Sequence, residues 1–151
     1  MADDSESIEA RLRRLEDIEA IRRLFQDYRR SLDGKDFRAY AELFAVDGEF
    51  IAGPDGSIRA KGREDIFALV DGMRGSLLTD QTGDDVHVAV NDRIDLDGDR
   101  ATATSTWVYV LRGEGDVPDV AKVGRYNDVL TREDGSWKFL CREAPCDIPA
   151  V

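Results

Sequence analysis

Residues 8–34 read IEARLRRLEDIEAIRRLFQDYRRSLDG, and this stretch decides the fold. Its apolar residues recur every three or four positions, which is the period of an amphipathic helix. Gly34 predicts a left-handed helix end, so the helix should stop at Asp33. Asp33 then lies at the negative end of the helix dipole, where a carboxylate is mildly disfavoured. This placement predicts either a partner or a functional task for Asp33. The apolar positions are Ile8, Leu12, Leu15, Ile18, Ile21, Leu24, Phe25, Tyr28 and Leu32.

The composition is that of one acidic, globular domain. The chain has 151 residues, of which 42% are hydrophobic and 35% charged, and its net charge is −11. A chain of this length can bury about 68–70% of the surface that its unfolded form exposes, and it does so without disulfides or structural metal ions. This negative charge argues against binding to nucleic acid or to a membrane surface, because phosphate backbones and anionic lipids repel a polyanion. We expect a flexible N-terminus (1–7), a single domain (8–146) and a C-terminal tail (147–151).

Targeting and redox features predict a cytoplasmic protein. No apolar run approaches the roughly 20 residues of a membrane-spanning helix. The acidic N-terminus lacks the apolar core of a signal peptide. Cys141 and Cys146 are the only cysteines, and with a single histidine in the chain they cannot assemble a usual zinc site. We therefore expect two reduced thiols.

Two shorter helices and one strand are predicted after the first helix. Asp36 can cap a second helix, and a third helix is expected from Gly62 onward. Between them, Asp47-Gly48 predicts a turn into a short strand over residues 49–52. Residues 76–85 are polar and irregular, as expected for a rim or lid. The second helix carries one apolar side, formed by Phe37, Tyr40, Ala41 and Phe44.

From Val86 onward the hydrophobic period is two, which is typical of strands. Val86, Val88, Val90, Ile94 and Leu96 share one parity, which places them on one face. The Asp97-Gly98 turn leads into a strand over residues 101–111, a loop at 113–118 leads into a strand over 120–131, and the Asp134-Gly135 turn leads into a strand over 137–146. Helices followed by an antiparallel meander indicate an α+β domain. Both faces of strand 101–111 carry sizeable side chains, so one face should meet the helices and the other a partner subunit.

His87 is the candidate acid–base residue. It is the only histidine, and histidine is the side chain that ordinarily gains and loses a proton near neutral pH. A carboxylate that orients the ring would complete a dyad, and Asp33 is the candidate for it. His87 points away from Val86 and Val88, so its face must line a pocket or a bulge must re-aim it. The alternative is a polar residue on the outer face of a strand.

Several short motifs occur in an order and spacing that is typical of one superfamily. The motifs are Leu32-Asp33-Gly34-Lys35-Asp36-Phe37, Leu43-Phe44, Asp47-Gly48, Gly62-Arg63-Glu64, residues 87–91, residues 97–101, Gly124-Arg125-Tyr126 and Gly135-Ser136-Trp137. From about Ile8 to Arg142, the chain resembles the nuclear transport factor 2-like superfamily and, within it, the SnoaL-like group. This resemblance implies a cone-shaped domain in which three helices and a strongly bent, mainly antiparallel sheet enclose a pocket. It also implies a homo-oligomer, either a dimer or a trimer.

Catalytic members of the group include scytalone dehydratase, bile acid dehydratase and hexachlorocyclohexane dehydrochlorinase. They carry an Asp near the end of the first helix, a His on the next long strand and an Arg on the last strand. Asp33, His87 and Arg142 match these places, and Tyr28 matches a tyrosine one turn before the Asp in the bile acid enzyme. The resemblance implies a lyase without metal or organic cofactor that acts on a small cyclic or polycyclic hydrophobic molecule. His87 would be the base and Asp33 its orienter, while Tyr28 and Arg142 would stabilise developing charge.

The chain also departs from these relatives. The second histidine of scytalone dehydratase is absent, and the Asp-Arg-Asp set of limonene epoxide hydrolase is not recognisable. Two other functions therefore stay open. One is a non-catalytic ligand-binding or dimerisation module, and the other is an isomerase or polyketide cyclase.

Other candidate residues also have structural alternatives. Phe50, Trp107 and Tyr109 are expected to line a pocket for a cyclic substrate, and core or interface packing is their alternative. For Tyr28 the alternative is core packing, and for Arg142 it is an ion pair across the sheet. Asp84 and Asp85 beside His87 leave a metal site as a minor alternative.

Overall fold

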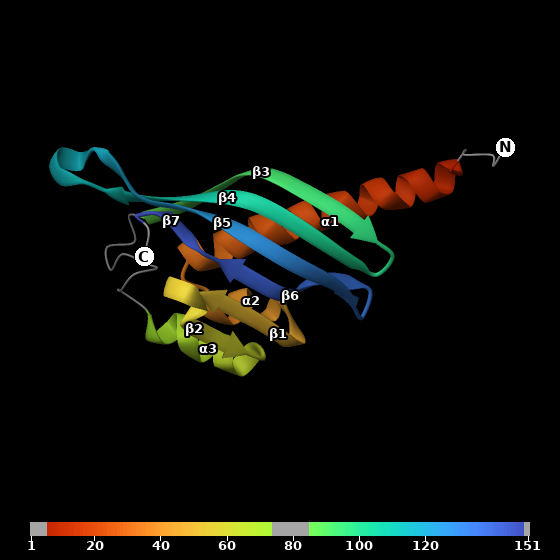
Figure 1. The fold of residues 1–151 in the computed structure, drawn as a ribbon, viewed down its shortest axis with the longest axis horizontal. Helices are drawn as coiled ribbons and strands as arrows, with labels where there is room; N and C mark the ends of the chain where they lie inside the picture. The colour runs from red at the N-terminus through yellow and green to blue at the C-terminus, as the bar shows by residue number, and fades with distance from the viewer. Residues whose placement is uncertain (1–5, 74–84, 150–151) are drawn as a thin grey trace.

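The computed structural model describes residues 6–73 and 85–149 (Figure 1). Helices dominate the first half of the chain, and a run of long antiparallel strands forms the second half. The elements are α1 (Ile8–Asp33), α2 (Phe37–Glu42), β1 (Phe44–Ala52), the 3-10 turn η1 (Pro54–Gly56), β2 (Ile58–Lys61), α3 (Arg63–Gly72), β3 (Asp85–Asp97), β4 (Arg100–Arg112), the 3-10 turn η2 (Glu114–Asp116), β5 (Pro118–Glu133), β6 (Ser136–Ala144) and β7 (Cys146–Ile148).

The strands form one curled, unclosed sheet in the order β2-β1-β6-β5-β4-β3, with β7 paired to β5 (Figure 1). All pairs are antiparallel except β1 and β6, which run parallel. α1 packs across β3 and β6, whereas α3 packs on β1 and β2. The predicted α+β architecture of three helices on a bent, mainly antiparallel sheet is confirmed. Within the described ranges, no helix is both long and apolar enough to cross a bilayer.

α1 is fixed to the sheet from Asp17 onward. The Ser7 hydroxyl caps the helix by accepting a hydrogen bond from the Ala10 N–H. Asp17 accepts hydrogen bonds from Arg132 at 2.7 Å and from the Trp137 indole at 3.0 Å, which ties the helix to the β5–β6 hairpin. Beyond Asp17 the helix buries one apolar stripe, whereas its first turns extend past the sheet (Figure 1). The buried residues are Ile21, Leu24, Phe25, Tyr28, Ser31 and Leu32.

The end of α1 differs from the expected glycine stop. Gly34 is right-handed, with φ −77° and ψ −2°, and the following residue, Lys35, adopts the left-handed conformation at φ 58°. A Cβ at Gly34 would lie 2.8 Å from the Arg30 carbonyl oxygen. Glycine therefore serves a close backbone approach here, and the prediction of a left-handed Gly34 was wrong. The helix nevertheless ends at Asp33, as expected.

The strands also depart from the periodicity in two places. β1 starts at Phe44, which was expected on the second helix, and it runs through Asp47-Gly48 as an irregularity instead of starting after a turn. The short β2 was not predicted. In β3 the register with β4 shifts between Val90 and Arg93, and Asn91 has φ 57°. This bulge reverses the parity of the strand.

The reversal decides which side chains of β3 face inward. Val86, Val88 and Val90 are exposed on the outer face, whereas Ile94 and Leu96 pack against the core. The expectation that all five share a face was therefore wrong. His87 lies before the bulge, on the inner face opposite Tyr109 of β4, and is only 5% exposed. Asp85 begins β3, and the rest of the expected rim, residues 76–84, lies outside the described residues.

Candidate active site

A cavity of about 380 Å³ opens between the second half of α1 and the inner face of the sheet. Its volume lies within the range of small-molecule sites, and its wall is mostly apolar and aromatic. Tyr28 and Leu32 of α1 form one side, and strands β1, β3, β4 and β5 supply the rings of the other. All five aromatic candidates from the sequence lie on this wall. The ring-bearing residues that line it are Tyr28, Phe50, His87, Trp107, Tyr109 and Tyr126.

The structure brings His87 and Asp33 together at this wall. His87 Nδ1 lies 2.7 Å from Asp33 Oδ1. The backbone N–H of His87 also donates to Oδ1 and Oδ2 of the same carboxylate, at 3.2 and 3.1 Å. Asp33 thus holds both the ring and the backbone of His87. The end of α1 and the start of β3 are 54 residues apart in the chain, and this clamp joins them.

The geometry also assigns roles to the two ring nitrogens. A carboxylate next to Nδ1 favours the tautomer in which Nδ1–H donates to Asp33. Nε2 is then the nitrogen that can accept a proton from a molecule in the cavity. Asp33 stabilises the imidazolium that would form, because its negative charge lies next to Nδ1. The pair therefore has the arrangement of a general base and its orienting carboxylate.

Tyr109 and a buried ion pair support His87 from the other side. The Tyr109 ring lies 4.5 Å from the His87 ring, centroid to centroid, at an interplanar angle of 31°. The Tyr109 hydroxyl donates to Asp85 Oδ2 at 3.0 Å, and Lys35 Nζ donates to Asp85 Oδ1 at 2.7 Å. Both Asp85 oxygens thus accept hydrogen bonds from Tyr109 and Lys35, which argues against the alternative that Asp85 is a metal ligand. Asp84 lies outside the described residues.

Tyr28 reaches the cavity as part of a cluster of buried tyrosines. Its hydroxyl accepts a hydrogen bond from the Tyr40 hydroxyl at 2.8 Å, and its ring contacts Tyr126 edge to face at 5.7 Å. Burial raises the pKa of all three hydroxyls well above the ordinary value of 10.0. They therefore stay protonated at neutral pH, and Tyr28 can donate a hydrogen bond to a ligand.

Arg142 lies behind this cluster and does not line the cavity. It is 1% exposed and forms two hydrogen bonds with Asp128, both at 2.8 Å. Its guanidinium carbon lies 4.2 Å from the Tyr28 ring centroid and 3.8 Å from that of Tyr126. Burial alone would lower the pKa of Arg142, but Asp128 raises it, so the pair stays charged. The structure shows the expected alternative, an ion pair across the sheet, in place of direct contact with a substrate.

Among the residues of the site that were not predicted from the sequence, three carry polar groups of interest. Tyr126 and Lys122 line the cavity, and Tyr40 bonds to Tyr28 behind it. A signal for the first two was present in β5, because Lys122, Gly124, Tyr126 and Asp128 alternate on one face. The missing information was which face of that strand points inward.

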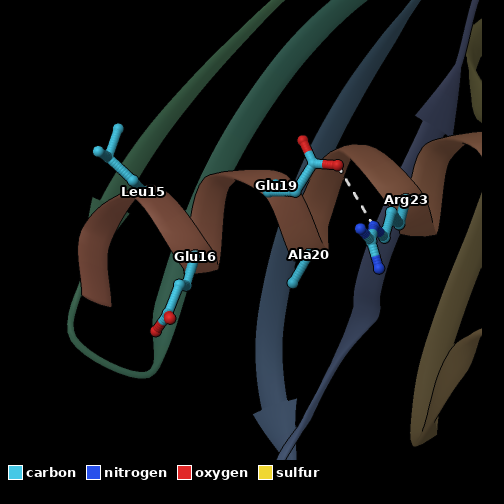
Figure 2. A pocket seen from close by; sticks show the side chains of 5 residues that line it. All are labelled: Leu15, Glu16, Glu19, Ala20 and Arg23. Carbon is cyan, nitrogen blue, oxygen red and sulfur yellow. Dashed lines mark hydrogen bonds and ion pairs between the residues drawn. The ribbon is translucent and has the colours of Figure 1, made fainter. Parts of the chain in front are cut away.

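A second hollow lies on the outer surface of α1 (Figure 2). Its five lining residues, Leu15, Glu16, Glu19, Ala20 and Arg23, all come from this one helix. Figure 2 shows the ion pair between Glu19 and Arg23, whose side chains are 58% and 73% exposed. One convex helix cannot enclose a ligand. The inner cavity with His87 is therefore the candidate active site.

The sequence matches the SnoaL-like domain over residues 13–143. The protein belongs to the SnoaL-like family. The predicted membership in the nuclear transport factor 2-like superfamily is thereby confirmed. A search of the curated proteins finds no match to this SnoaL-like chain.

Solved structures place the SnoaL-like protein among several relatives. It is similar to an NTF2-like protein with a cystatin-like fold from Novosphingobium aromaticivorans, with 31% identity over 97% of this chain and 92% of that chain and a TM-score of 0.80. A candidate scytalone dehydratase from the same organism is 27% identical over 88% and 85% of the two chains, with a TM-score of 0.71. ActVI-ORFA from Streptomyces coelicolor shares the fold at 23% identity over 87% and 97%, with a TM-score of 0.73.

Proposed function

We propose that the protein is a cofactor-independent lyase of the dehydratase type that acts on a small cyclic hydrophobic molecule. One observation carries the proposal, which is the 2.7 Å contact between His87 Nδ1 and Asp33 Oδ1 at the wall of an apolar cavity. A base that is oriented by a carboxylate and screened from water is the arrangement that proton abstraction from carbon requires. The similarity to a candidate scytalone dehydratase supports the same reaction class.

The proposed reaction is a β-elimination of water. Nε2 of His87 takes a proton from the carbon next to a carbonyl, and the electron pair of the broken C–H bond forms an enolate. The enolate then expels the hydroxyl group from the neighbouring carbon, and the imidazolium returns its proton to this oxygen as it leaves. The products are an unsaturated carbonyl compound and water, and His87 is neutral again.

Asp33 and Tyr28 would lower the barrier in different ways. Asp33 stabilises the imidazolium, which exists only between the two proton transfers. The protonated Tyr28 hydroxyl can donate a hydrogen bond to the enolate oxygen, where negative charge develops. Arg142 holds the Tyr28 and Tyr126 rings in place by packing against them.

The test uses 3-hydroxy-1-tetralone, which loses water to give fluorescent 1-naphthol. We expect the wild-type protein to accelerate this conversion, and His87→Gln to lose the acceleration. Asp33→Asn should reduce kcat on the order of 10²–10⁴-fold, because the ring then loses its tautomer control and its counter-charge. Asp27→Asn is the matched control, since Asp27 is an exposed carboxylate on the same helix and should leave kcat unchanged.

Other outcomes separate the alternative functions. A protein that binds 1-tetralone but neither dehydrates the probe nor exchanges the C2 protons of 1-tetralone for deuterium would be a ligand-binding module. Exchange without dehydration would favour the isomerase or cyclase alternative. If the folded His87→Gln variant keeps wild-type activity, the pair of His87 and Asp33 is not the catalytic base of the reaction. Thermal unfolding of each variant checks that the fold is intact.

A further inference from the structure

A lysine lies in the same cross-strand row as the proposed base. His87 of β3 is directly opposite Tyr109 of β4, and Tyr109 is directly opposite Lys122 of β5. Residues directly opposite one another in an antiparallel sheet share a face, so all three point inward. Figure 1 shows these three strands side by side. Lys122 also lines the cavity, where it is half-buried.

A bulge in β5 places the lysine inward. Val120 is paired with Val110 and Lys122 with Tyr109, so Ala121 is the extra residue. Before the bulge, Val120 is 59% exposed on the outer face. After it, Lys122 continues the inner row that includes Tyr126 and the buried Asp128. Without the extra residue, Lys122 would project toward the outer face.

The charge of Lys122 has no counter-charge in the described structure. The other inward charges are paired, as Asp85 is with Lys35 and Asp128 with Arg142. Within residues 6–73 and 85–149, no carboxylate forms an ion pair with Lys122, and none lines the cavity. An ammonium group beside an apolar wall is costly unless water or an anion satisfies it. A bound anion would both pair with it and displace that water.

We infer that the cavity takes cyclic apolar molecules that carry a carboxylate, and that Lys122 binds this carboxylate. Strands lie about 4.8 Å apart, so the backbones of His87 and Lys122 are about 10 Å apart, with the Tyr109 ring between them. A molecule whose carboxylate pairs with Lys122 would lie along Tyr109 and present its other end to His87. One ammonium group suits a carboxylate better than a phosphate, whose sites usually gather several donors. The presentation to His87 rests on the proposed function, whereas carboxylate binding does not.

The experiment compares 2-naphthoate with its neutral analogue, 2-naphthamide, by isothermal titration calorimetry. We expect the wild-type protein to bind the carboxylate about tenfold to a hundredfold more tightly than the amide. Lys122→Met should abolish this preference and leave amide affinity unchanged, which also shows that the cavity is intact. Lys61→Met is the matched control, because Lys61 is exposed on β2 outside the cavity and should keep the preference. About 0.15 M salt screens repulsion from the rest of the acidic surface.

Equal wild-type affinities for the two probes would overturn the inference, as would failure to bind either of them at millimolar concentration. The inference would also be wrong if Lys122→Met kept the preference for naphthoate. His87→Gln separates this inference from the lyase proposal, since it should retain the preference whether or not the wild-type protein is an enzyme. If the protein is an active lyase but its affinity for naphthoate does not depend on Lys122, the proposed function stands and the inference about Lys122 is wrong.

Discussion

Asp33 shows how one carboxylate can serve the fold and the site together. It contacts His87 through both the ring and the backbone, and it lies at the negative end of α1. The unfavourable helix-end position is offset by the His87 N–H, which is a donor whatever the charge of the ring. The carboxylate therefore remains bound when the imidazole is neutral, and it is in place when the imidazole takes a proton.

The buried tyrosines predict a distinctive alkaline titration. Burial raises the pKa of Tyr28, Tyr40 and Tyr126 above 10.0, so three of the four tyrosines stay protonated in the folded protein at pH 10. We expect the phenolate absorbance of the native protein near pH 10 to lie well below that of the urea-unfolded protein. The same shifts contribute stability that is complete below pH 10 and is lost as the pH rises further. Equal native and unfolded absorbance at pH 10 would contradict the burial of these hydroxyls.

The Arg142–Asp128 pair predicts a strong dependence of each partner on the other. Arg142→Met should lower the free energy of unfolding by about 3–5 kcal/mol, because it leaves a buried carboxylate without its cation. Asp128→Leu should be similarly damaging. The double variant should be less destabilised than the sum of the single variants, since neither charge then remains. Urea denaturation measures all three, and strict additivity would show that the two charges do not act as a pair.

At the scale of elements, one glycine sets the position of a cavity wall. A Cβ at Gly124 of β5 would lie 2.3 Å from the Trp107 ring and 2.3 Å from the Pro145 carbonyl oxygen. The Trp107 ring therefore lies against bare backbone, and its Nε1–H donates to the Arg125 carbonyl at 2.9 Å. Only a residue without a side chain permits this contact.

Gly124→Ala should therefore displace Trp107 and change the cavity. We expect a loss of about 1–3 kcal/mol in the free energy of unfolding, a shift in tryptophan fluorescence and weaker binding of 1-tetralone. Gly72→Ala in α3 is the matched control, since no atom lies within 4 Å of its added Cβ. That variant should be neutral or more stable by up to about 1 kcal/mol. Unchanged fluorescence in Gly124→Ala would contradict the tight packing of Trp107.

Elements whose signals are local could be predicted, and those that depend on distant pairing could not. The period of α1 and the turn at Asp97-Gly98 are written within a few residues, and both occur as expected. The parallel pairing of β1 with β6 joins the two halves of the chain, and the four-residue β2 is too short to show a period. The bulge at Asn91 made the predicted faces of β3 wrong, because one extra residue moves every later side chain to the opposite face of the sheet.

Bulges also limited what could be predicted at the site. Counting back from the Asp134-Gly135 turn places Asp128 opposite Cys141, but the register shifts near Leu130 and brings Arg142 there instead. Periodicity could place Asp33 at a helix end and His87 on a strand, yet it could not show that they meet. The residue types proposed the pair, the family resemblance supported it, and the coordinates show the contact.

At the scale of the whole molecule, the outer face of the sheet is unusually apolar. Valines occupy paired outward positions on three neighbouring strands, and four of them are 37–59% exposed. No described element covers this face. We propose that a second copy of the chain covers it, since a contiguous apolar patch of this kind marks an interface. The valines are Val86, Val88 and Val90 of β3, Val108 and Val110 of β4, and Val120 and Val123 of β5.

The oligomer can be tested by sedimentation velocity. We expect the wild-type protein to sediment as a species larger than its 16.9 kDa chain, and Val88→Lys to shift it to the mass of one chain. A lysine at the centre of the patch would bury an unpaired charge in the interface. Val46→Lys is the control, because Val46 is 65% exposed on β1, away from the patch. A monomeric wild-type protein would contradict this proposal.

The parallel pairing of β1 with β6 determines when the domain can fold during its synthesis. On the ribosome, β1 emerges long before β6, which is its parallel neighbour in the sheet. Until β6 emerges, the Phe44 ring, which contacts Phe50 within β1, has no Phe139 ring to pack against. Nascent chains that stop before Ser136 should therefore be held by chaperones or degraded, and the domain should fold only after β6 has emerged.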